Sequence, residues 1–135
     1  METNVEKFAN LDIRVGEILS AEVFEEAKKP AYILKIDFGK HIGIKKTSAQ
    51  ITNYDTNELI GFKCIGIVNL GDKQIGPIIS QCLILGSTDS NGDVLLLKPS
   101  EGSMIGDKVS YNIINLCQKY YYCQLEHALS QKIIK

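Results

Sequence analysis

The stretch KPAYILKIDFG (residues 29–39) carries the clearest strand pattern in the chain. Apolar side chains recur at every second position over residues 32–38, while Lys35 and Asp37 fall on the opposite parity. Because successive side chains of a strand point to opposite faces, this alternation predicts a strand with one buried face. Ile33 shares the polar parity, so the second face is not purely solvated.

Strand-like segments continue on both sides of this one. They cover residues 12–24, 41–51, 62–70, 78–86 and 93–99. A capping-box spacing between Thr3 and Glu6 predicts one short helix over residues 3–10 that packs on the body, and Gly16 suggests a bulge in the first strand. Several short, curved strands with little helix predict an all-β fold, a five-stranded Greek-key barrel, with a β-sandwich as the alternative.

Length and composition are typical of one globular domain. With 135 residues, of which 44% are hydrophobic and 23% charged, the chain can bury a single core. The first residues include early acids and no long apolar run, so we expect neither a signal peptide nor a membrane span. None of the four cysteines forms a C-x-x-C motif, and His41 and His127 lack metal-ligand spacing. We therefore expect no metal, no cofactor and a cytoplasmic protein with reduced thiols, two of them buried in apolar strands.

The character of the chain changes towards its C-terminus. The last part shows no strand alternation, and Leu116 and Tyr120 begin a series at helical spacing. We therefore divide the chain into a domain over residues 1–110 and a C-terminal extension over residues 111–135 that is helical or disordered.

Charge is distributed unevenly along the chain. The net charge is only −1, yet six lysines against Asp37 alone give residues 28–46 a local balance of +5. A basic segment on an otherwise acidic body can bind a polyanion at one patch. A solubilising surface is the alternative explanation.

The adjacent lysines in IGIKKTSAQI (residues 42–51) call for a local irregularity. Neighbouring residues of a strand point opposite ways. We nevertheless expect both Lys45 and Lys46 to be outward, with Ile42 and Ile44 in the core. This arrangement requires a bulge or the end of the strand at the two lysines.

Binding residues are better represented than catalytic ones. The sequence has neither a G-x-S-x-G motif nor a P-loop, so we expect no enzyme activity. A nucleic-acid-binding face needs cations for phosphates, planar groups for bases and small polar donors. The candidate RNA-binding residues are Lys29, Tyr32, Lys35, Lys45, Lys46, Ser48, Asn69, Lys73 and Ser80. Three of them have structural alternatives, Tyr32 as a core residue, Asn69 as a turn cap and Ser80 as a partner for backbone groups.

Several motifs occur in order and at compact spacing. They are DIRVGEI (12–18), KPAYILKIDFG (29–39), GIKKTSAQI (43–51), VNLGDKQIGPIISQCLILG (68–86) and LLLKPSEGSMIGDKV (95–109). Together they resemble the tRNA-binding domain family and, in detail, its CsaA-like members. The resemblance implies an OB-fold barrel with an additional C-terminal β elaboration, which forms a homodimer and binds structured tRNA without reading one sequence.

The same resemblance indicates where the RNA would bind. In the family the binding surface lies near the turn between the fourth and fifth strands of the barrel. By motif this points to Asn69, Lys73 and Ser80, with Lys45, Lys46 and Ser48 alongside. The CsaA-like members also imply an alternative function, that of an export-related chaperone that binds unfolded precursor proteins or peptides.

Overall fold

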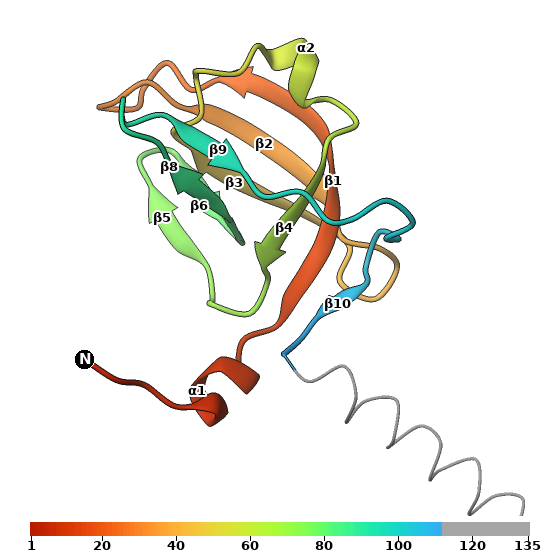
Figure 1. The fold of residues 1–135 in the computed structure, drawn as a ribbon. Helices are drawn as coiled ribbons and strands as arrows, with labels where there is room; N and C mark the ends of the chain where they lie inside the picture. The colour runs from red at the N-terminus through yellow and green to blue at the C-terminus, as the bar shows by residue number, and fades with distance from the viewer. Residues whose placement is uncertain (112–135) are drawn as a thin grey trace, which may run out of the picture.

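The computed structural model of this protein describes residues 1–111. The predicted C-terminal extension therefore lies outside the described residues, apart from Tyr111. Strands dominate the described part, together with two short helices, α1 (Val5–Ala9) and α2 (Thr56–Leu59) (Figure 1). No helix of this part has the length and hydrophobicity needed to cross a membrane.

Five antiparallel strands form the main sheet, in the order β3-β2-β1-β4-β7. Their bounds are Ile13–Val23 for β1, Tyr32–Asp37 for β2, Ile44–Ala49 for β3, Lys63–Ile67 for β4 and Leu83–Ile84 for β7. The long β1 pairs with β2 along one edge and with β4 along the other, so it bends around the core and joins the two halves of the sheet.

The sheet is drawn together by the segment that leads into β7. The Gln81 backbone N–H donates to the Lys46 carbonyl oxygen over 2.7 Å, and the Lys46 N–H donates to Gln81 Oε1 over 3.0 Å. One residue further along each segment, Thr47 Oγ1 donates to the carbonyl oxygen of Cys82 over 2.8 Å. These bonds connect β3 to the chain entering β7 and nearly close the barrel. The predicted five-stranded OB-fold barrel is therefore confirmed over the β-sandwich alternative.

Short strands extend this barrel. Two of them form a hairpin, β5 (Lys73–Ile75) with β6 (Ile78–Ser80), and two more form a second hairpin, β8 (Gly86–Thr88) with β9 (Val94–Leu96). The last, β10 (Lys108–Val109), pairs with the start of β1 and corresponds to the predicted C-terminal β elaboration.

The core follows the alternation of residues 32–38. Tyr32, Leu34, Ile36 and Phe38 are all buried, as predicted. A Cβ atom on Gly16 would lie 2.7 Å from Phe38 Cε1, and one on Gly66 would lie 2.9 Å from Phe38 Cζ. Glycine is needed at both positions because the Phe38 ring packs directly on the backbones of β1 and β4.

The irregularity of β1 lies away from Gly16. The register with β2 shifts between Ile18 and Ser20, so the bulge predicted at Gly16 was wrong in position. The predicted helix is also shorter than expected. Its cap is Asn4, whose Oδ1 accepts from the Lys7 N–H over 2.9 Å, and no residue of α1 is buried. The helix therefore buries no face on the barrel, and within residues 1–111 its aromatic contact is that of Phe8 with Tyr111, with ring centroids 5.8 Å apart.

Two thiols lie in the core, as expected from the apolar strands around them. Burial raises the pKa of Cys64 to about 12, and the neighbouring Cys82 contributes to that rise. Burial likewise raises the pKa of Cys82 to about 12, against an opposing effect of Lys45. The sequence prediction of small buried cysteines is confirmed for this pair.

These raised pKa values predict an alkaline loss of stability. The unfolded chain releases each thiol proton near pH 9, whereas the folded chain retains it up to about pH 12. Unfolding is therefore favoured as the pH rises between these values, by about 1 kcal/mol for each thiol at pH 10. Urea unfolding from pH 7 to pH 10 should show a flatter fall for the Cys64→Ala/Cys82→Ala variant than for the natural chain. Identical slopes for the two proteins would contradict the assignment.

Candidate nucleic-acid interface

Lys35 and Lys46 form a like-charged pair on the outer side of the barrel. They are directly opposite each other in the β2–β3 register, and both have the parity opposite to the buried residues Leu34 and Thr47. Like charges at directly opposed positions destabilise a sheet unless an anion lies between them. Neither lysine forms an ion pair within residues 1–111. The only ion pair in that part of the chain joins Arg14 to Asp12.

Polar residues continue this surface from β3 to the neighbouring hairpin. The Ser48 N–H donates to Ser80 Oγ over 3.2 Å, and Ser80 is paired with Lys73 in the β5–β6 register. Lys29, in the loop between β1 and β2, lines a cleft together with Ser48. We call this set the basic face: Lys29, Lys35, Lys46, Ser48, Lys73 and Ser80.

Acidic residues bound the basic face on one side. Asp37 follows Lys35 on the same face of β2, and Glu17 and Glu22 are paired with β2 from β1. Carboxylates therefore flank the Lys35–Lys46 pair on its β1 side and at the end of β2. This arrangement restricts a polyanion to one part of the surface.

Three of the predicted binding residues, Tyr32, Lys45 and Asn69, lie apart from the basic face. Tyr32 is in the core, 8% exposed, with its hydroxyl donating to the Tyr54 carbonyl oxygen over 2.7 Å, so its ring is not presented to a base. Lys45 has the inward parity of β3, on the side of Cys82. β3 begins at Ile44 and its register with β2 has no bulge, so adjacent lysines simply point to opposite faces.

One neighbouring expectation was wrong for the same reason. Ile44 shares the outward parity of Lys46 and is 59% exposed, whereas we expected it in the core. Ile42, before the strand, is half-buried against the core, as expected.

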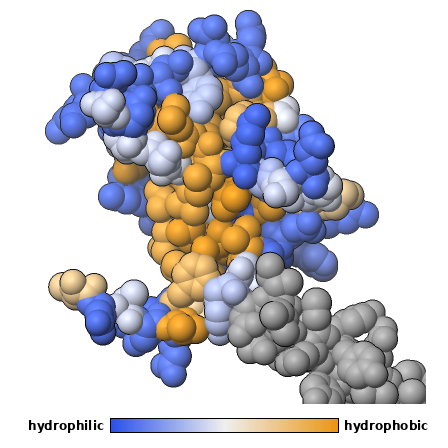
Figure 2. All heavy atoms as spheres, in the orientation of Figure 1, coloured by the Kyte–Doolittle hydropathy of each residue, from blue (hydrophilic) through white to orange (hydrophobic). Residues whose placement is uncertain are grey.

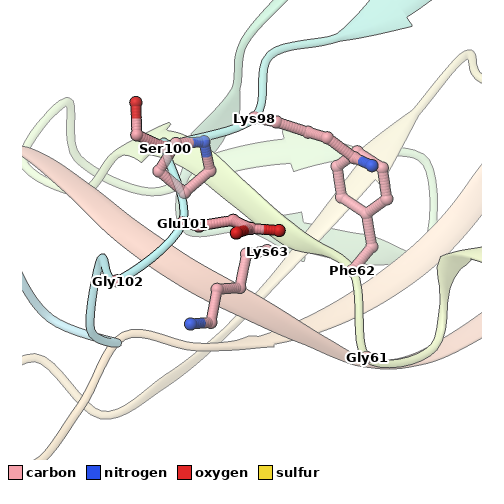
Figure 3. A pocket seen from close by; sticks show the side chains of 8 residues that line it. Gly61, Phe62, Lys63, Lys98, Ser100, Glu101 and Gly102 are labelled. Carbon is pink, nitrogen blue, oxygen red and sulfur yellow. The ribbon is translucent and has the colours of Figure 1, made fainter.

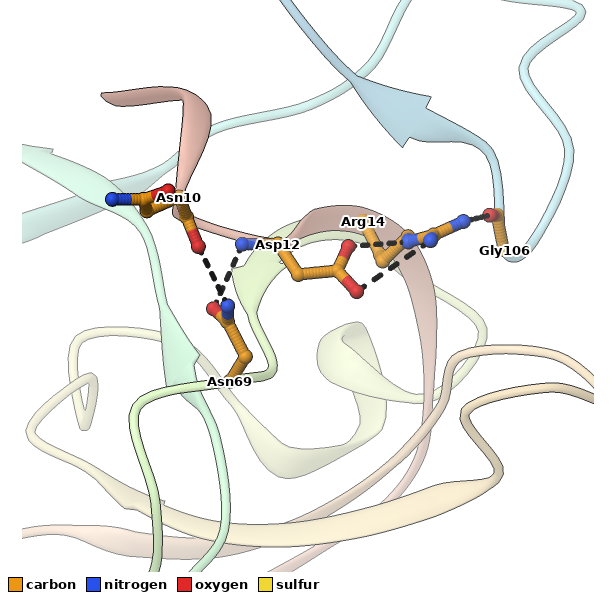
Figure 4. A network of polar contacts seen from close by, with 5 residues as sticks. All are labelled: Asn10, Asp12, Arg14, Asn69 and Gly106. Carbon is orange, nitrogen blue, oxygen red and sulfur yellow. Dashed lines mark hydrogen bonds and ion pairs between the residues drawn. The ribbon is translucent and has the colours of Figure 1, made fainter. Parts of the chain in front are cut away.

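The Asn69 side chain, which follows β4, bonds to the backbone of the segment before β1. Its Oδ1 accepts from the Asp12 N–H over 2.7 Å, and its Nδ2 donates to the Asn10 carbonyl oxygen over 2.7 Å (Figure 4). Beside it, Arg14 Nε donates to Asp12 Oδ1 over 2.6 Å and Arg14 Nη1 donates to the Gly106 carbonyl oxygen over 3.1 Å. Both ends of the Asn69 amide are thus engaged in holding the start of β1.

A second basic cleft lies at the start of β4. It has a volume of about 330 Å³ and is lined by residues 61–63 and 98–102 (Figure 3). Lys98 Nζ lies 5.1 Å from the centroid of the Phe62 ring, and Lys63 Nζ donates to the Ser103 carbonyl oxygen over 2.6 Å. Both ammonium groups are therefore engaged with the protein, unlike the Lys35–Lys46 pair.

Sequence reasoning missed three residues that shape the basic face. Gln81 holds β3 with its backbone and its side chain, and Lys28 and Gln50 line the cleft beside Lys29. Lys28 could have been found from the charge count, because it lies within the +5 segment. Within residues 1–111, no group of His, Cys, Asp or Glu side chains is placed to hold a metal ion.

Comparison with protein families identifies this barrel. A family model described as a putative tRNA binding domain matches residues 13–108, which include the whole basic face. This chain belongs to that family. The family predicted from the motifs is thereby confirmed.

Two solved structures match along most of this chain. The CsaA chaperone protein from Picrophilus torridus is 49% identical, with a TM-score of 0.77 over 81% of this chain and 100% of its own. The chaperone CsaA from Bacillus anthracis str. Ames is 41% identical, with a TM-score of 0.76 over 82% of this chain and 100% of its own.

A longer relative is matched only in part. The methionine–tRNA ligase of Pyrococcus horikoshii is 35% identical over 109 residues, which cover 77% of this chain but 14% of the ligase. This chain therefore spans only a small part of the length of the ligases that it matches.

Proposed function

We propose that this chain is a non-catalytic, CsaA-type tRNA-binding protein that holds structured tRNA through its basic face. The Lys35–Lys46 pair carries the proposal, because two opposed lysines that have no counter-ion within residues 1–111 form a site for phosphate groups. Lys73, reached through Ser48 and Ser80, and Lys29 extend the same surface. Contacts to phosphates suit folded RNA, because its deep major groove hides the base edges.

The salt dependence of binding tests this proposal. With four lysines on phosphates, the logarithm of the affinity for total tRNA should fall against that of the salt concentration with a slope of about −3 to −4. A mobility-shift titration at several salt concentrations measures the slope, with single-stranded DNA as the competing polyanion. Salt-insensitive binding, or equal affinity for the DNA at every salt concentration, would count against a tRNA-binding face.

Homodimer formation is the second part of the proposal, and an exposed apolar band supports it. Leu83, Leu95 and Leu97 are 49%, 46% and 41% exposed. The Leu97 N–H donates to the Leu85 carbonyl oxygen, which places the β9 end beside β7. Figure 2 shows hydrophobic side chains gathered over the side of the molecule that carries β8, β9 and the lower part of β4, down to α1. Contiguous apolar surface of this kind is typical of an interface.

Sedimentation of the full chain measures the dimer. We expect a dimer at micromolar concentration and a folded monomer for the Leu95→Asp/Leu97→Asp variant, because two carboxylates cannot be buried in an apolar interface. The Lys98→Asp variant, which alters a neighbouring exposed residue, should remain dimeric. A dimer that persists in the double variant would place the interface elsewhere.

The same band supports the alternative function of binding unfolded precursor peptides. If the natural chain is a monomer in solution, the exposed leucines are open to a peptide. In that case it should suppress the aggregation of an unfolded precursor, and the Leu95→Asp/Leu97→Asp variant should not. A monomer that has no effect on aggregation would remove the chaperone alternative.

A further inference from the structure

A cleft beside the basic face separates the β1–β2 loop from the β5–β6 hairpin. Its volume is about 490 Å³, within the range of small-ligand sites. Its floor is apolar, formed by Phe24, Ala31, Ala49 and Ile75. Phe24 is 3% exposed and Ala49 belongs to the core cluster, so the floor is part of the rigid barrel.

The rim of this cleft carries solvent-accessible polar groups that have no hydrogen-bond partner within residues 1–111. Ser48 and Gln50 line it, and neither the Ser48 hydroxyl nor the Gln50 amide bonds to another residue of the described part. The nearby Thr47 hydroxyl, in contrast, donates to the Cys82 carbonyl oxygen. Lys28 and Lys29 stand at the same rim, with Glu26 as the acidic residue of the lining.

We propose that this cleft receives one unpaired nucleotide of the bound RNA, an inference that rests on the proposed function. The base packs on the apolar floor, and its edge bonds to the Ser48 hydroxyl and the Gln50 amide. The adjoining phosphates meet Lys28 and Lys29. A base inside a duplex is stacked and cannot enter the cleft, so the site distinguishes RNA with open loops or ends from fully paired RNA. The two ammonium groups at the rim favour a phosphodiester over a neutral peptide.

The test compares two RNAs on one variant. Ser48→Ala/Gln50→Ala removes the free polar groups and leaves the lysines in place. We expect its affinity for a tRNA transcript to fall about tenfold, the effect of two lost hydrogen bonds. Its affinity for a fully paired RNA duplex should fall less than its affinity for tRNA, and its salt slope should not change because the lysines remain. An unchanged affinity for tRNA, or an equal loss for both RNAs, would overturn the inference.

A matched control and a direct probe separate this inference from the proposed function. Lys35→Glu/Lys46→Glu should weaken the binding of both RNAs. An unpaired oligoadenylate should shift the methyl resonances of Ala31, Ala49 and Ile75 upfield in the natural chain, through the ring current of a stacked base, and not in Ser48→Ala/Gln50→Ala. If tRNA binds but the oligoadenylate causes no such shifts, the inference about the cleft is wrong and the proposed basic face still stands. Absence of any RNA binding would overturn both, and shifts caused only by an unfolded peptide would make the cleft a peptide site.

Discussion

The Lys35→Glu/Lys46→Glu variant should bind tRNA about 60-fold more weakly than the natural chain at about 0.1 M salt. Each phosphate contact that releases a counter-ion contributes about eightfold to the affinity at this concentration, so two contacts contribute about 60-fold. The salt slope should also become shallower by about 2. Because the contacts are to phosphates, the loss should be similar for every tRNA species. Filter binding or fluorescence anisotropy over a salt series measures both quantities.

Two controls separate the basic face from a general effect of charge. Lys63→Glu/Lys98→Glu makes the same change in net charge at the second cleft. Glu17, which is paired with Lys63, lies between that cleft and the basic face. Lys45→Glu changes the adjacent lysine, which has the inward parity. We expect a loss of less than tenfold for each, the limit of one phosphate contact. If the second-cleft variant weakens binding as much as Lys35→Glu/Lys46→Glu does, the effect belongs to the whole protein and the basic face is not the site.

The Phe38→Ala variant should lose about 3–5 kcal/mol of unfolding free energy. Phe38 is 1% exposed, and its ring packs on the backbones of β1 and β4 at Gly16 and Gly66. Removing it leaves a cavity that the flanking glycines have no side chains to fill. The expected loss is a large fraction of the 5–15 kcal/mol typical of a whole domain. Urea unfolding followed by circular dichroism measures it, with Phe38→Leu as the control that keeps most of the volume.

A double-mutant cycle tests the reason for this loss. Gly16→Ala places a methyl group against the Phe38 ring and should cost about 1–3 kcal/mol by overpacking. In the Phe38→Ala background the same methyl group enters the cavity and should cost less, with a coupling of at least about 0.5 kcal/mol. Strictly additive losses would show that Gly16 is constrained by something other than the Phe38 ring.

The strand pattern and the family could be read from the sequence. Alternation over residues 32–38 predicts the buried face of β2, and this face is buried as expected. Strict alternation over the whole of β3 would also have placed Lys45 and Lys46 on opposite faces. It would have placed Ile44 outward with Lys46 and Ser48, because alternation is a local property of an extended backbone.

Other assignments depend on contacts between distant segments. Gly16 looks like a bulge in the sequence, but its lack of a side chain is required by Phe38, which is 22 residues away in sequence. Asn69 looks like a ligand contact, but both ends of its amide bond to the segment before β1. The sequence alone does not distinguish a polar residue that binds RNA from one that bonds to another part of the chain.

By itself the sequence determined an all-β barrel of the tRNA-binding domain family, with a concentration of lysines over residues 28–46. Only the tertiary structure decided which of these lysines meet on one surface. Lys73 and Ser80 join Lys46 and Ser48 because Gln81 holds β3 from 35 residues further along the chain. The periodicity of a strand predicts the face of the sheet on which each side chain lies. The closure of the barrel decides which strands, and therefore which side chains, become neighbours on that face.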